Sequence, residues 1–187
     1  MQLKEQMTYA VKDSIIEALT TILSLMPNVK EIGANEAFQE KGNIAASLGF
    51  VGKIEGSFIV KISDAAARKV LSKMFNNELE GDTQDFNDCV GELVNIIAGC
   101  VKTKIEQFGY SFITNIPSVI RGEQTLNVTA SNKADIITMF VDCADFNFQF
   151  IMLYMLNSQA EEMKYANLKK QNSQDAEKAI KDIIGQK

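Results

Sequence analysis

A narrow polar stripe runs along one long predicted helix, residues 85–108. At about 100° per residue its members fall on one side of the helix; they are Asp88, Glu92, Asn95, Gly99, Lys102 and Glu106. The other side of the helix is apolar, so the stripe faces solvent or a partner. A carboxylate at Glu92 and a carboxamide at Asn95, beside the bare backbone of Gly99, would suit insertion into a partner's shallow pocket.

The stripe also has an ordinary explanation, because any amphipathic surface helix shows polar residues opposite an apolar face. Two of its residues weaken that explanation. Inside a helix, Asn is up to about 0.7 kcal/mol less favourable than Ala, and Gly is about 1 kcal/mol less favourable. Asn95 and Gly99 therefore do not serve the stability of the helix. Two interpretations of the stripe therefore remain open, a functional site and the polar face of an ordinary surface helix.

The composition restricts which chemistry such a site can perform. None of the 187 residues is His, which excludes Ser-His and Cys-His nucleophiles, histidine phosphotransfer and most catalytic zinc sites. The three cysteines, Cys89, Cys100 and Cys143, include no CxxC pair. We interpret them as small hydrophobic residues of a protein in the reducing cytoplasm. Chemistry must then come from carboxylates, amides, hydroxyls, lysines or thiols.

Charge and hydrophobicity limit the partners. With 24 acidic residues against 19 basic ones, the net charge is −5, which argues against nucleic acid and anionic membranes. The longest apolar run, residues 146–156, is broken by Asn147 and Gln149. It is also shorter than the roughly 20 residues that a membrane-spanning helix needs. We expect a globular protein that does not enter the membrane.

The elements around the stripe form two similar halves. Each half reads as a helix, a strand, a crossing segment and a hairpin, which indicates a diverged duplication. The pattern predicts an α+β domain over residues 1–156, with a mostly antiparallel sheet of about six strands and a few helices; residues 157–187 would be a polar tail, helical or flexible. The predicted helices are 7–26, 65–75 and 85–108; the predicted strands are 29–38, 44–51, 54–62, 111–120, 136–142 and 146–156.

The motif Asp88-x-x-x-Glu92-x-x-Asn95 carries a family resemblance. Within Asp88-Cys-Val-Gly-Glu-Leu-Val-Asn-Ile-Ile-Ala-Gly99 it resembles the signature of the CheC/CheX/FliY phosphatases of bacterial chemotaxis, and CheX most closely. The flanking glycines, the segments 108–112 and 116–119 and the hairpin 49–62 resemble CheX in order and spacing. The resemblance covers residues 7–156 and implies a CheC-like duplicated fold.

The resemblance also implies an activity, hydrolysis of the aspartyl phosphate of the response regulator CheY or a related receiver domain. Glu92 and Asn95 would be the catalytic residues: Asn95 would position the attacking water, and Glu92 would pair with the active-site lysine of the regulator. Asp88, Gly99 and Lys102 are the candidate partner-binding residues. Asp88 would contact the rim of the partner, cap the helix or orient it, and Lys102 would contact the acidic surface of the regulator or serve only solubility. The chain would need no metal or cofactor of its own, because magnesium would belong to the regulator. A homodimer is also implied.

The first predicted helix carries a degenerate copy of the motif, Asp13-x-x-x-Glu17-x-x-Thr20. A threonine hydroxyl cannot present the donor and acceptor of a planar amide, so we expect this copy to be inactive, with Asp13 and Glu17 on a solvated helix face. We also expect its surroundings to hinder a partner. The helix at 85–108 has Ile96, Ala98 and Gly99 at the positions that Thr21, Leu23 and Ser24 occupy in the helix at 7–26.

A second functional class remains open. A module of the same fold could bind a receiver, or a flagellar or signalling partner, without hydrolysing anything. The presence of both Glu92 and Asn95 favours the phosphatase.

Overall fold

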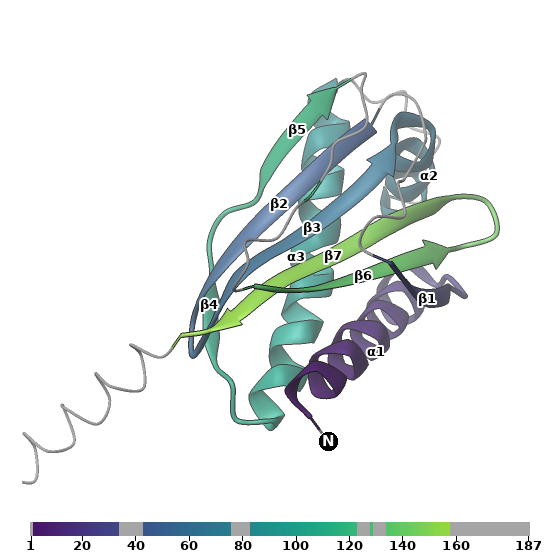
Figure 1. The fold of residues 1–187 in the computed structure, drawn as a ribbon. Coiled ribbons are helices and arrows are strands. Elements are labelled where there is room, and N and C mark those ends of the chain that lie inside the picture. Colours follow the sequence, from purple (N-terminus) through teal and green to yellow (C-terminus); the bar gives the residue numbers. More distant parts are fainter. Residues whose placement is uncertain (1, 34–42, 76–82, 123–127, 129–133, 158–187) are drawn as a thin grey trace, which may run out of the picture.

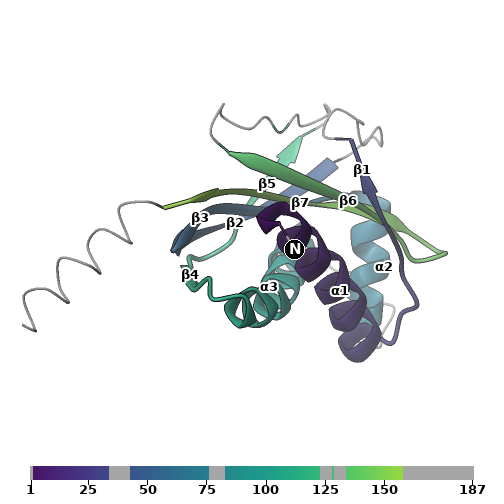
Figure 2. The same ribbon diagram turned by 60° about the horizontal axis from the view of Figure 1, so that its bottom comes forward.

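The computed structural model describes residues 2–33, 43–75, 83–122, 128 and 134–157, so the tail predicted at 157–187 lies outside the described residues except for Asn157. In this part of the chain, helices cover one face of an antiparallel sheet (Figures 1 and 2). The helices are α1 (Leu3–Leu23), α2 (Asp64–Phe75) and α3 (Thr83–Gln107). The strands are β1 (Asn28–Ile32), β2 (Asn43–Gly52), β3 (Ile54–Ser63), β4 (Phe112–Thr114), β5 (Ser118–Gly122), β6 (Asp135–Asp142) and β7 (Asn147–Leu156). None of the described helices is long and apolar enough to span a membrane.

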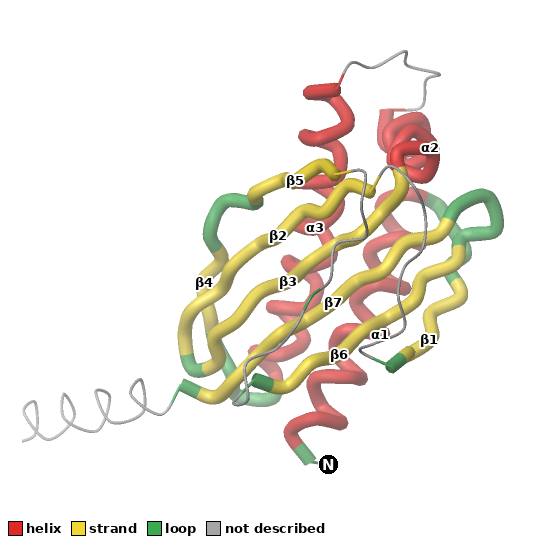
Figure 3. The backbone as a smooth tube through the Cα atoms, turned by 45° about the horizontal axis from the view of Figure 1, so that its top comes forward, coloured by secondary structure: helices red, strands yellow, loops and turns green. Residues whose placement is uncertain are grey.

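The order of the strands confirms the predicted duplication. It is β1-β6-β7-β3-β2-β4, and β5 also pairs with β2 (Figure 3). Exchanging β2 with β6, β3 with β7, and β1 with the β4/β5 edge turns this order into its own reverse. The first strand of each half therefore pairs with the hairpin of the other half, so the two halves share one sheet.

One predicted strand, residues 111–120, is divided in the structure. β4 pairs with residues 50–52 of β2, and β5 pairs with residues 43–47 of the same strand. The two therefore occupy one place at the sheet edge, and the connection between them contains Pro117. Proline has no backbone N–H to donate to a strand ladder, which is why it is confined to edges and interruptions.

The end of α1 differs from the prediction. We predicted a helix over residues 7–26, which Pro27 follows. In the structure α1 ends at Leu23, with Ser24 in the left-handed conformation at φ 52°. The amides of Ser24 and Leu25 both donate to the carbonyl of Leu19, the latter at 3.0 Å, so the chain turns away from the helix axis here. Proline disfavours helix at its own position and at the residue before it, but α1 already ends at Leu23, at the left-handed turn of Ser24.

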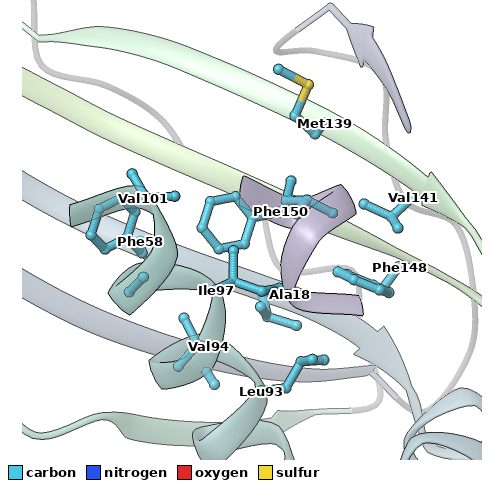
Figure 4. Close-up of a cluster of buried hydrophobic side chains, with 14 of the residues drawn as sticks. Ala18, Phe58, Leu93, Val94, Ile97, Val101, Met139, Val141, Phe148 and Phe150 are labelled. Atoms are coloured by element: carbon cyan, nitrogen blue, oxygen red, sulfur yellow. The ribbon is translucent and has the colours of Figure 1, made fainter. Parts of the chain in front are cut away.

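The apolar side of α3 is packed against the sheet (Figure 4). Four of its side chains, Leu93, Val94, Ile97 and Val101, are fully buried. They meet the aromatic residues of the inner sheet face, where the rings of Phe58 and Phe150 stack with centroids 5.8 Å apart. Burial of each such side chain is worth about 1.5–3 kcal/mol. The polar stripe on the opposite side of α3 must therefore face outward.

The far end of α3 is fixed to the tip of the β2–β3 hairpin. The backbone amide of Lys53 donates to the carbonyl of Ser111 at 2.8 Å, and its Nζ donates to the carbonyl of Gly109 at 2.7 Å. Gly109 closes α3 in the left-handed region at φ 87°. A Cβ at Gly52 would lie 2.3 Å from the Ser111 carbonyl oxygen. This hairpin tip therefore needs glycine to reach the end of α3.

We predict that Gly52→Ala lowers the free energy of unfolding by about 1–3 kcal/mol, because the added methyl group forces two backbone segments apart. Chemical denaturation of the variant and the parent measures the difference. Gly99→Ala is the matched control: a Cβ at this position would meet no atom within 4 Å beyond its own helix, and the substitution should raise stability by up to about 1 kcal/mol through helix propensity. Equal stability of Gly52→Ala and the parent would contradict the close approach.

Candidate functional site

The structure places the predicted site residues along one outward face of α3. Asp88, Glu92 and Gly99 are exposed, and Asn95 and Lys102 are partly buried. Asp88 accepts a hydrogen bond from Nε2 of Gln84 at 2.8 Å, one turn earlier. In the part of the chain that the structure describes, the side chains of Glu92 and Asn95 form no hydrogen bond or ion pair. Neither group is therefore engaged by the residues that the structure describes.

The two glycines of the motif have different surroundings. A Cβ at Gly91 would lie 3.6 Å from Cγ of Pro117 and 3.8 Å from Cγ2 of Val119, which is ordinary contact. The small residue thus lets the β4–β5 segment lie against α3 beside the stripe. A Cβ at Gly99 would meet no atom within 4 Å beyond its own helix, and Thr103 Oγ1 donates a hydrogen bond to the Gly99 carbonyl at 3.1 Å. The bare backbone one turn from Asn95 is therefore accessible to another surface.

The degenerate motif on α1 is not a simple solvated face. Nζ of Lys104, on α3, lies 2.6 Å from Oδ2 of Asp13 and 2.6 Å from Oε2 of Glu17. Hydrogen bonds, first with Asp13 and then with Glu17, raise the pKa of Lys104 above its usual value. The expectation for Asp13 and Glu17 is corrected in this respect, because both carboxylates are already paired across the helix interface. The sequence did not reveal this role of Lys104, because Lys104 lies on α3, far along the chain from Asp13 and Glu17.

The surroundings of Thr20 agree only partly with the expectation. Thr20, Thr21 and Ser24 are exposed, whereas Leu23 is 5% exposed and points into the core. Leu23 therefore cannot hinder an approaching partner, and that part of the prediction was wrong. Leu23 is the last residue of α1, and its side chain packs in the hydrophobic core and not on the surface.

The cysteines are poor nucleophiles in this structure. Burial raises the pKa of the Cys89 thiol to about 12 and, together with the nearby charge of Asp142, that of Cys143 to about 11. Burial, more than the charge of Glu17, also raises the pKa of Cys100. Because the thiolate is the reactive form, these thiols are unreactive near neutral pH. Among the described residues, no cluster of three His, Cys, Asp or Glu side chains could hold a metal ion.

Comparison with known proteins agrees with the family resemblance and the fold. The profile of the family "Chemotaxis phosphatase CheX" matches residues 44–141. The CheY-P phosphatase CheX of Thermotoga maritima is 26% identical over 114 residues, which are 60% of this chain and 74% of that protein.

Solved structures share the whole architecture. A chemotaxis protein CheX from Desulfovibrio desulfuricans has a TM-score of 0.66 at 23% identity, covering 81% of this chain and 99% of that one. CheX in a CheX–CheY–BeF3–Mg complex from Borrelia burgdorferi has a TM-score of 0.63 at 20% identity, covering 79% and 96%. FliY of Thermotoga maritima has a TM-score of 0.56 at 16% identity, covering 86% and 91%.

The duplicated sheet and the outward helix motif thus define a protein of the CheC/CheX/FliY class. Because the family profile covers more than half of the sequence, the chain belongs to the family of the chemotaxis phosphatase CheX.

Proposed function

We propose that this protein hydrolyses the aspartyl phosphate of a phosphorylated CheY-like receiver domain. One observation carries the proposal: Glu92 and Asn95, on adjacent turns of α3, lie on the outward face of the helix without a partner among the described residues, in a chain of the CheX family. Two relatives support the choice of partner. The Thermotoga protein is a CheY-P phosphatase, and the Borrelia relative forms a complex with CheY.

Asn95 suits the positioning of water. Hydrolysis of an acyl phosphate needs a water molecule in line with the bond that breaks, so catalysis is mostly positioning and electrostatics. The carboxamide can accept a hydrogen bond from the water and donate one to a phosphoryl oxygen without a change of charge. The open backbone at Gly99 lets the receiver come close enough for this contact.

Glu92 serves as an anchor in this proposal. It is exposed and has no partner in the part of the chain that the structure describes, so its carboxylate can form an ion pair with a cation in the receiver's active site. Asp88, held by Gln84, and Lys102 lie at the two ends of the contact, where Lys102 would meet the acidic surface of a receiver. The receiver would hold the magnesium ion.

The homodimer and the cytoplasmic location stay predictions. Light scattering of the purified protein tests whether it is a homodimer.

The alternative is an adaptor of the same fold that binds a receiver, or a flagellar or signalling partner, without hydrolysis. One assay separates the two: the decay of the phosphoryl group on a CheY-like receiver, with and without this protein. Faster decay supports the phosphatase, whereas unchanged decay together with binding supports the adaptor.

We predict that Asn95→Ala folds normally and loses about 100-fold or more of the acceleration of receiver dephosphorylation, because only the water-positioning amide is removed. Asn95→Asp tests the same point with a side chain of equal shape that cannot donate. Initial rates of phosphate release measure both variants. Full activity in either variant would remove the Asn95 amide from the mechanism.

We predict that Glu92→Ala binds a beryllofluoride-loaded receiver about tenfold more weakly or worse, since a charged hydrogen bond across the interface is lost. Calorimetric titration gives the dissociation constants. Glu106→Ala is the matched control, because it removes an exposed carboxylate of the same stripe farther along α3. Equal weakening by both substitutions would assign the effect to net charge and not to Glu92.

We predict that Thr20→Asn, made in the Asn95→Ala background, recovers less than about a tenth of the parent rate. The amide is restored, but Lys104 still holds the carboxylate of Glu17. The measurement is the same dephosphorylation assay, and the Asn95→Ala variant alone gives its baseline. A larger recovery would show that the missing amide by itself silences α1.

A further inference from the structure

The cation of Lys104 lies over one copy of the motif and not over the other. α1 and α3 pack side by side (Figure 2), and Nζ of Lys104 is 2.6 Å from the carboxylates of both Asp13 and Glu17. The Lys104 side chain is 20% exposed, so packing holds it near these groups, while the two carboxylates are about half exposed.

The difference follows from the lengths of the two helices. When the motifs are aligned, the residue that corresponds to Lys104 is Val29. α1 ends at Leu23, so Val29 falls in β1, where it is buried and apolar. α3 continues to Gln107, and its added turns carry Lys104 to the first motif. Glu92 therefore has no equivalent cation within the described residues.

We propose that Lys104 closes the α1 motif to receivers, so that each chain offers one receiver-binding site and not two. The inference rests on the proposed function, in which an exposed carboxylate at the position of Glu92 recognises a cation of the receiver. At the equivalent position, Glu17 is already bound by a lysine of its own chain. An intramolecular partner competes at a high effective concentration, so the cation of a second receiver cannot displace it readily.

Removal of Lys104 should therefore create a second binding site. Lys104→Met keeps the length and packing of the side chain and leaves two exposed carboxylates one turn apart, Asp13 and Glu17, without their cation. Their combined charge would then attract a receiver's lysine. The missing amide at Thr20 affects catalysis and not this ion pair, so binding is the direct measurement.

The test is made in the Glu92→Ala background, where the α3 site is weakened. Titration with a CheY-like receiver loaded with beryllofluoride and magnesium should show that Lys104→Met tightens binding about tenfold, and that adding Glu17→Ala removes the gain. In the otherwise unchanged chain, Lys104→Met should bind two receivers where the parent binds one. Lys12→Met is the matched control, because Lys12 is an exposed cation beside Asp13 that forms no ion pair with a described residue.

The outcomes separate this inference from the function on which it rests. No gain from Lys104→Met, or an equal gain from Lys12→Met, would overturn the role of Lys104 while the parent still binds. A parent that neither binds nor dephosphorylates the receiver would overturn the proposed function and this inference together. Lys104→Gln repeats the test with an uncharged polar side chain, and thermal unfolding of each variant confirms that it is folded.

Discussion

The burial of one side of α3 against the sheet determines how the site is presented. Leu93, Val94, Ile97 and Val101 lie at zero exposure against the aromatic inner face of the sheet. A helix has a fixed angular relation between its residues, so fixing this apolar side also fixes the direction of the polar one. Glu92 and Asn95 need no loop to hold them outward, because rotation of α3 would expose the core.

The shared sheet makes the two halves depend on each other. Since β1 pairs with β6, and β4 and β5 pair with β2, neither half can keep its edge strand without the hairpin of the other. Duplication of this kind would give two equivalent helices, but the halves have diverged at their helix ends. The left-handed turn at Ser24 shortens α1, and Gly109 closes a longer α3. The greater length of α3 beyond its motif therefore decides which carboxylates are paired within the chain.

The two motifs also differ in their ionic and hydrogen-bonding partners. Asp13 and Glu17 share the charge of Lys104, while Glu92 and Asn95 stay unpaired within the described residues. Lys104 binds two carboxylates at once, Asp13 and Glu17. The effect of this bridge on recognition follows directly, because a carboxylate with a fixed intramolecular cation is a weaker target for a partner's lysine.

The sequence by itself determined the features that depend on local periodicity. These are the long amphipathic helix, the stripe with Glu92 and Asn95, both hairpins and the duplicated order of elements. Each follows from the pattern of residues that are close together in the chain. Tertiary structure alone decided three others: the pairing of both β4 and β5 with β2, the inward direction of Leu23, and the bridge from Lys104 to Asp13 and Glu17. Each depends on contacts between residues far apart in the chain, and hydrophobic periodicity does not specify which distant residues meet.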